Sequence, residues 1–465
     1  MLGSAAWRGV ARHGIATSRR WRRATTVVLP LMVVGLVQPW AGTAPGGPAG
    51  TDGKVPAASA GVGPTADPPQ PGPWAVGYRT VRIADPRRPG RQLITSLWYP
   101  AQAGAVAGPA TSLLPRTIDL PGTAGAGRPQ GVARPIPLAA PIPAVGSAGR
   151  VGVAAGGSCP EVAGGERGRA GQPAFYPLVG DVGFDSDVAV TDAPPAPGPF
   201  PLVVFSHGSA GSRVQAAYLM EALASHGYVV AAPDHPGDTM VDVAAGRAEP
   251  QLAMAVDRSR DLSAVIDALT DPSCAVRPRI RPDQIAAVGF SFGGLTAIVS
   301  SVGLLAAPPD PRVRVSVGIA AATAPLPAAF LARIRVPTLL LAGTRDPVVT
   351  LDDNAGRAFR ELSSSRPRVS ATVTDATHNS FTEICRQDGL LGAARIPPVL
   401  RLRVALTAAV TCRPPLLAAP AAHVVADRTV VAFLDWQVRG DAASQRYLAV
   451  GGQRVGPGVV LRVQR

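Results

Sequence analysis

The strongest chemical signal in the sequence is a serine flanked by glycines, in the segment 289–294, which reads Gly-Phe-Ser-Phe-Gly-Gly. It fits the pattern G-x-S-x-G, in which a nucleophilic serine occupies a sharp turn between a strand and a helix. Side chains two residues before and after the serine would collide in such a turn, so glycine is needed at Gly289 and Gly293. An apolar run precedes Ser291 and another follows it, as this context requires. Ser291 is therefore predicted to be the nucleophile of an acyl-transfer reaction.

An acid and a base for this serine are expected after it in the chain. Asp346 follows the apolar run 336–342, and His378 follows the next predicted strand. Serine, acid, histidine is the order found in hydrolases that carry this serine motif. Among the six histidines, only His378 follows both the serine and the acid in a loop after a strand. Asp375 is a rival acid, although three residues before the base is an awkward approach.

A second turn, at 205–209, ends an earlier strand and reads Phe-Ser-His-Gly-Ser. A His-Gly turn at this place usually carries part of the oxyanion hole, the N–H donors that stabilise a tetrahedral intermediate. We expect the backbone N–H groups of Ser209 and Phe292 to be these donors. His207 and Gly208 are expected to support the loop rather than to act in proton transfer.

The elements that must position these residues are short apolar strands that alternate with helices. Strands are predicted over 202–206, 228–232, 285–289, 313–320, 336–342 and 369–373, and helices over 214–225, 256–269, 292–302 and 424–438. Strands that are apolar on both faces and separated by helices indicate a parallel sheet covered on both sides. The pattern predicts the α/β class and an α/β-hydrolase fold, a mostly parallel twisted sheet with helices on both faces. A β-hairpin over 76–84 and 92–99 precedes these elements.

The N-terminus has the layout of an export signal, with arginines before the apolar run 24–37 and small residues after it. Residues 1–44 are predicted to be a signal peptide and the protein to be secreted. The alternative is an uncleaved segment that anchors the protein in a membrane. Four further parts are expected: a disordered Ala/Gly/Pro-rich linker at 45–73, a catalytic domain at 74–440, an irregular insertion within it at about 101–172, and a C-terminal tail at 441–465.

Charge and cysteine content exclude some classes of function. The net charge of +14 comes almost entirely from arginine, and no basic run is interleaved with aromatics in the way that follows a phosphate backbone. Nucleic-acid binding is therefore not expected. Four cysteines in an exported chain favour disulfides, and Cys385–Cys412 and Cys159–Cys274 are preferred, with free buried thiols as the alternative. No Cys/His cluster has the spacing of metal ligands, so neither a metal nor another cofactor is expected.

Taken together, these motifs resemble those of a known family, the secreted platelet-activating-factor acetylhydrolases with their bacterial lipase and esterase relatives. The matching segments are 205–208 with Arg213 behind it, 223–231, 291–294 and 378–381, which reads His-Asn-Ser-Phe. The resemblance extends over roughly residues 76–440, apart from the insertion. Phe290 departs from the pattern, because many relatives carry histidine before the nucleophile. The resemblance implies a serine esterase with the α/β-hydrolase fold.

The sequence thus predicts an exported serine hydrolase that cleaves carboxylic esters, with short-chain, lipid or phospholipid acyl groups, through an acyl-enzyme. Its partner is expected to be a small-molecule or lipid ester; peripheral contact with a membrane or lipid is left open, and no oligomeric state is predicted. One alternative is the same residues acting on a lactone, thioester or amide, as in dienelactone hydrolases. Another is a non-catalytic surface protein on a hydrolase scaffold. Met240 and Met254 are expected to form either an apolar lip for the acyl chain or an ordinary helix face.

Overall fold

The structure is a computed structural model that describes residues 71–104, 159–162, 169–274 and 276–465. The predicted signal peptide at 1–44 and nearly all of the predicted linker at 45–73 lie outside these residues, as do 105–158 and 163–168, most of the expected insertion. Within the described ranges, no helix is long and apolar enough to cross a membrane. The same ranges contain no group of three or more His, Cys, Asp or Glu side chains arranged to hold a metal ion.

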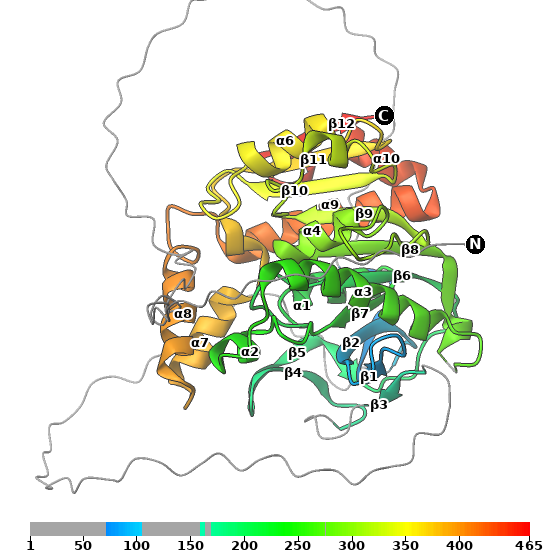
Figure 1. The fold of residues 1–465 in the computed structure, drawn as a ribbon, viewed down its shortest axis with the longest axis vertical. Helices are drawn as coiled ribbons and strands as arrows, with labels where there is room; N and C mark the ends of the chain where they lie inside the picture. Colours follow the sequence, from blue (N-terminus) through cyan, green and yellow to red (C-terminus); the bar gives the residue numbers. More distant parts are fainter. Residues whose placement is uncertain (1–70, 105–158, 163–168, 275) are drawn as a thin grey trace, which may run out of the picture. The chain divides into compact units, whose positions relative to one another are not determined.

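Six parallel strands form the centre of the sheet (Figure 1). They are β6 (Phe200–Ser206), β7 (Val229–Pro233), β8 (Ile280–Phe290), β9 (Val313–Ile319), β10 (Thr338–Gly343) and β11 (Arg368–Val373). Their order across the sheet is β11-β10-β9-β8-β6-β7, and every neighbouring pair in it is parallel. Each of the six apolar runs predicted as strands corresponds to one of them.

Further strands extend the sheet on both sides of this centre. On the β7 side lie β2 (Gln92–Ala101), β1 (Ala75–Ala84), β5 (Val182–Thr191) and β4 (Pro173–Val179), and β3 (Glu161–Val162) pairs with β1. The antiparallel pair β1–β2 is the predicted hairpin. On the opposite side, β12 (Val459–Gln464) pairs antiparallel with β11.

The segment 441–465, predicted as a tail beyond the catalytic domain, is therefore part of the fold. It contains α10 (Ala442–Ala449), α11 (Gly452–Val455) and the edge strand β12. Along β12 the residues alternate between more and less buried positions, which is the pattern of a strand with one face on the core. The alternation at 459–464 is the feature by which the sequence could have indicated a last strand after residue 440.

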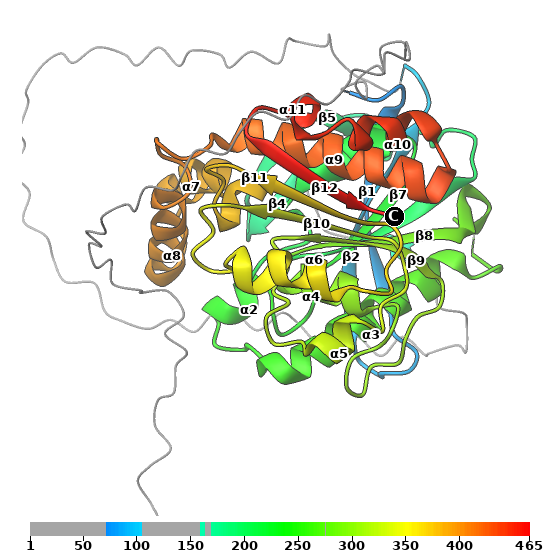
Figure 2. The same ribbon diagram turned by 90° about the horizontal axis from the view of Figure 1, so that it is seen from above.

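Helices cover both faces of the sheet (Figures 1 and 2). On one face lie α1 (Ala217–Ser225) and α9 (Ala419–Arg439), and on the other α3 (Gln251–Thr270) and α4 (Phe292–Val299). Alternate residues of β6 point to the two layers: Val203 and Phe205 pack with α1 and α9, whereas Leu202 and Val204 pack with α3. Burial on both faces explains why the strand segments are apolar without interruption. Shorter helices are α2 (Met240–Ala244), α5 (Ala328–Leu331) and α6 (Arg357–Glu361).

Two disulfides are present, Cys159–Cys274 and Cys385–Cys412, and this is the pairing preferred from the sequence. The second one links the first turn of α7 (Ile384–Ala393) to the residues after α8 (Pro398–Ala409). This pair of helices is not among the predicted elements. Its signal is nevertheless visible in α8, where the buried residues Leu400, Val404 and Ala408 recur every four positions.

Candidate active site

Ser291 occupies the turn between β8 and α4 with φ = 56°, a left-handed conformation that is strained for a residue with a side chain. The flanking glycines leave no room for a larger residue. A Cβ atom on Gly289 would lie 2.1 Å from the carbonyl oxygen of Gly293, and one on Gly293 would lie 1.9 Å from that of Ser206. The steric reason given for the glycines from the sequence is therefore correct. The turn presents Ser291 at the carboxyl end of β8, where α4 begins.

His378 and Asp346 reach this serine from the ends of two other strands. His378 lies in the short helical turn η3 (His378–Phe381) after β11, and its Nε2 is 2.9 Å from Oγ of Ser291. Its Nδ1 is 2.7 Å from Oδ2 of Asp346, which follows β10. A carboxylate only accepts, so Nδ1 carries the proton and Nε2 is free to accept the serine proton. The other oxygen of Asp346 accepts from the N–H groups of Val348 and Val349 at 2.8 and 2.7 Å, which fixes the carboxylate.

The rival acid Asp375 is engaged elsewhere. Its Oδ1 accepts from Nε of Arg345 at 3.1 Å, in an exposed ion pair, and its N–H donates to the hydroxyl of Thr344 at 3.0 Å. The structure thus brings Asp346, and not Asp375, to His378. Phe290, the residue that departs from the family pattern, packs beside His378, and the centroids of the two rings are 4.9 Å apart.

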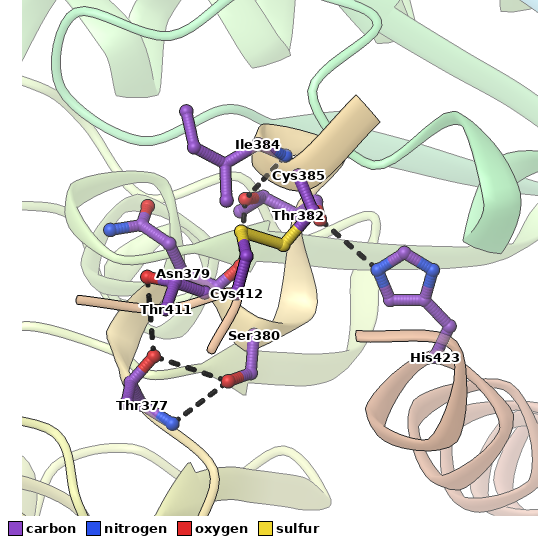
Figure 3. The surroundings of a disulfide bond; sticks show 9 residues. All are labelled: Thr377, Asn379, Ser380, Thr382, Ile384, Cys385, Thr411, Cys412 and His423. Carbon is purple, nitrogen blue, oxygen red and sulfur yellow. Dashed lines mark hydrogen bonds between the residues drawn. A yellow bond between two sulfur atoms is a disulfide. The ribbon is translucent and has the colours of Figure 1, made fainter. Parts of the chain in front are cut away.

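The loop that carries His378 is braced by its neighbours (Figure 3). Thr377 and Ser380 form a capping box around η3, and the hydroxyl of Thr377 also donates to that of Thr411, next to the disulfide at Cys412. His423 of α9 contacts the carbonyl of Thr382 through Nε2 at 3.1 Å.

The contacts of His423 are structural. Its ring stacks on Tyr218, with centroids 3.6 Å apart and planes at 3°. Burial lowers the pKa of His423 to about 4, so the imidazole is neutral at pH 7. A partly buried neutral imidazole that stacks on a tyrosine and bonds to a loop carbonyl supports the loop and does not compete with His378 for a proton.

The loop at 207–209 passes directly in front of the serine. A Cβ atom on Gly208 would lie 3.3 Å from Cβ of Ser291, so the backbone there is in close approach. Within the part of the chain that the structure describes, the N–H groups of Ser209 and Phe292 bond to no protein acceptor. Two such N–H groups, one on this loop and one at the start of α4, are what an oxyanion requires.

His207 and Gly208 hold this loop from within. Nε2 of the fully buried His207 accepts from the N–H of His235 at 3.1 Å, which leaves the ring proton on Nδ1, 2.7 Å from the carbonyl oxygen of Gly208. Burial, with the nearby charge of Arg258, lowers the pKa of His207 well below its usual value, so the ring stays neutral. The N–H of Gly208 donates to Oε1 of Gln215 at 2.7 Å.

Sequence reasoning missed the charged residues behind this loop, of which Arg258 is the largest. Arg258 lies in the middle of α3, is 0% exposed, and forms an ion pair with Asp238 at 2.7 Å. A signal for it exists, because Met254, Arg258, Leu262 and Val265 share the buried face of α3 at helical spacing. An arginine on the core-facing side of a helix is expected to form ion pairs or hydrogen bonds, because a buried charge without partners is costly.

A cavity of about 270 Å³ lies beside the loop, between the β4–β5 hairpin and the start of α2. Its walls include Leu178 from the hairpin, Gly211 and Ser212, and Met240 with Val241 from α2. Ser291 is not one of the wall residues. Met254, by contrast, is 1% exposed on the buried face of α3, which is the second of the two alternatives, an ordinary helix face.

Comparisons with known proteins give a consistent grouping. Residues 190–394 match the sequence model of a family described as PET hydrolase-like. A cutinase from Thermobifida alba is 29% identical over 181 residues, which cover 38% of this chain and 52% of the cutinase. A platelet-activating factor acetylhydrolase from Canis lupus familiaris is 25% identical over 224 residues, or 40% of this chain and 48% of that protein. The chain thus spans about half the length of the curated relatives it matches.

Among solved structures, a ferulic acid esterase from Streptomyces cinnamoneus has a TM-score of 0.49 and 23% identity, covering 81% of this chain and 93% of that one. The sheet order and the match to the PET hydrolase-like family give the chain an α/β-hydrolase fold. The predicted resemblance to serine esterases of this superfamily is confirmed. The matched region contains Ser291, Asp346 and His378, and it ends before α8.

Proposed function

We propose that this protein is a carboxylic-ester hydrolase with Ser291 as nucleophile, His378 as general base and acid, and Asp346 as the residue that orients the histidine. One observation carries the proposal: the continuous contact from Oγ of Ser291 through the two nitrogens of His378 to the carboxylate of Asp346, at 2.9 and 2.7 Å. Ester cleavage is the activity that the names of the cutinase and acetylhydrolase relatives favour.

Acylation begins when Nε2 of His378 takes the proton of Ser291 while Oγ attacks the ester carbonyl carbon. The carbonyl oxygen becomes an oxyanion and accepts from the N–H groups of Ser209 and Phe292, each worth about 3 kcal/mol in comparable sites. The intermediate then collapses, the alcohol leaves with the proton from His378, and the acyl group remains on Oγ. Asp346 keeps the second ring proton on Nδ1 and stabilises the imidazolium.

Deacylation repeats these steps with water as the nucleophile. His378 takes a proton from water, hydroxide attacks the acyl carbon, and the second intermediate expels Oγ of Ser291, which recovers its proton from His378. The products are an alcohol and a carboxylic acid. Small-molecule or lipid esters are the proposed substrates.

Export is proposed together with this activity. The two disulfides favour an oxidising compartment, since thiols in the cytosol are kept reduced. Secretion, and not membrane anchoring, is the form we propose.

The test is Ser291→Ala, with Ser364→Ala as a matched control at an exposed site. Hydrolysis of p-nitrophenyl butyrate and labelling by a fluorophosphonate probe are both expected to vanish in Ser291→Ala and to be unchanged in Ser364→Ala. Circular dichroism should be the same for both variants. Turnover in Ser291→Ala equal to that of the unmodified protein would refute the proposed function.

A further inference from the structure

Arg258 contacts the oxyanion loop, residues 207–209, mainly through backbone carbonyl groups of that loop. Its Nη1 donates to the carbonyl oxygen of His207 at 2.5 Å, and its Nη2 donates to that of Gly208 at 3.2 Å. A planar guanidinium with five donors can hold two successive carbonyls in one fixed geometry, which an ammonium cannot.

The carbonyl of Gly208 and the N–H of Ser209 belong to one peptide unit. That unit is planar and trans, so the two bonds point in opposite directions. The Gly208 oxygen receives hydrogen bonds from Arg258, from Nδ1 of His207 at 2.7 Å and from the N–H of Gly211 at 3.0 Å. Because these three donors fix the Gly208 carbonyl oxygen, the planar peptide also fixes the direction of the Ser209 N–H, which points the opposite way. A cation on the oxygen also polarises the peptide and strengthens the N–H as a donor.

Asp238 adds a second link between Arg258 and Ser209. One oxygen of Asp238 accepts from Nε and Nη2 of Arg258 at 3.0 and 2.7 Å. The other accepts from the hydroxyl of Ser209 at 2.9 Å and from the N–H of Ala210 at 3.0 Å. Ser209 is thus held on both sides, through its peptide and through its hydroxyl.

The second oxyanion donor is also in contact with Arg258. The guanidinium carbon lies 5.0 Å from the ring centroid of Phe292, within the range of a cation–π contact. Phe292 is the first residue of α4, and its N–H is the donor at the start of that helix. One buried side chain is therefore linked to both proposed oxyanion donors: to the N–H of Ser209 through the carbonyl of the Gly208–Ser209 peptide, and to Phe292 through its ring.

We propose that Arg258 is a positioning residue for the oxyanion hole, holding the Gly208–Ser209 peptide and the start of α4 in the geometry that the tetrahedral intermediate needs. The inference rests on the proposed function and adds to it. Arg258 does not touch substrate; it acts through the two peptide groups that do. Its loss should therefore weaken binding of the transition state more than binding of the substrate.

The experiment compares Arg258→Met and Arg258→Lys with Arg260→Met, a partly exposed arginine on the same helix. For both Arg258 variants we expect kcat for p-nitrophenyl butyrate to fall 10- to 100-fold, with KM changed less than threefold. The inhibition constant of a trifluoromethyl ketone, which forms an oxyanion on Ser291, should rise by the same factor as kcat falls. Arg260→Met should match the unmodified protein in all three quantities.

The outcomes separate this inference from the proposed function. The positioning role is wrong if the folded Arg258 variants keep full kcat and inhibitor affinity. The proposed function still stands in that case, provided that the unmodified protein hydrolyses the ester and Ser291→Ala does not. If the unmodified protein has no esterase activity, the proposed function itself fails. Should Arg258→Met not fold, Arg258→Lys decides, because it keeps the charge and loses the fork. A lower melting temperature with unchanged kcat per titrated active site would mean a structural role only.

Discussion

Glu221 is a titratable side chain through which the electrostatics of a group of acids on α1 and α9 can be tested. It lies on α1, and its Oε1 accepts from the hydroxyl of Tyr176 at 2.7 Å and from that of Ser186 at 2.5 Å. Burial raises the pKa of Glu221 to about 7, and the nearby carboxyl of Glu383 contributes to the rise. Asp427 of α9 completes a group of three acids, and burial raises the pKa of its carboxyl as well.

The size of the effect follows from the pKa difference between the folded and unfolded chain. The pKa of Glu221 rises from 4.5 to about 7 on folding, and each unit corresponds to about 1.4 kcal/mol, so the total is about 3 kcal/mol. The folded state holds this proton more tightly than the unfolded chain does. Its contribution to stability is thus fully present below pH 4.5 and is lost as the pH rises through 7.

Glu221→Gln removes this titration and keeps the oxygen that accepts from Tyr176 and Ser186. Relative to the unmodified protein, we expect the variant to have a similar free energy of unfolding at pH 4.5. At pH 8 it should be more stable by up to about 3 kcal/mol. Urea unfolding followed by tryptophan fluorescence at both pH values measures the difference.

Glu161→Gln, at an exposed position on β3, is the control and should show no such dependence on pH. The reasoning is refuted if Glu221→Gln is no more stable at pH 8 than at pH 4.5, each compared with the unmodified protein. That result would mean that the ionised carboxylate is well accommodated by its two hydroxyl donors.

Three further predictions concern the loops that carry the proposed triad. Asp346→Asn should lower kcat by about 10⁴-fold with the fold retained, because an amide no longer selects the Nδ1–H tautomer of His378; a loss below tenfold would return Asp375 to consideration. His423→Ala should lower the melting temperature through loss of the stack on Tyr218 and leave kcat/KM within a few-fold, whereas a loss as large as that of His378→Ala would contradict its structural role. Replacing Cys385 and Cys412 by serine opens a loop of sequence separation 27 and should cost about 3.5 kcal/mol in urea unfolding. An unchanged midpoint in this variant, or free thiols at both positions of the unmodified protein in peptide mass spectrometry, would contradict the disulfide.

The sequence predicts the central strands and the chemical groups well because both have local signals. The glycines around Ser291 are required by a single turn, and the structure shows the collisions that any side chain there would cause. Asp346 and His378 each follow an apolar strand directly, so the parallel order of β8, β10 and β11 brings them to one edge of the sheet. Motif order and strand order together are sufficient for this part.

Residues whose importance depends on contacts distant in sequence could not be predicted in the same way. Glu221 reads as an ordinary polar position of α1 until β4 and β5 place Tyr176 and Ser186 over it. Asp238 contacts Arg258, 20 positions later, and Ser209, 29 positions earlier, and no local pattern joins the three. Arg258 alone has a local signal, because it lies on the apolar face of α3. Its position on that face does not predict which loop its side chain contacts.

The pairing of β12 with β11 has a consequence for handling this protein. β12 covers β11 along its whole length, from Val373 opposite Val459 to Arg368 opposite Gln464. A shortened chain that stops before Val459 would leave the outer N–H and C=O groups of β11 without partners, and the same edge on a second molecule could then pair with it. Such a variant would retain Ser291, Asp346 and His378 and still be prone to self-association and precipitation. Low yields from a truncated form would then reflect an open sheet edge, and not a damaged active site.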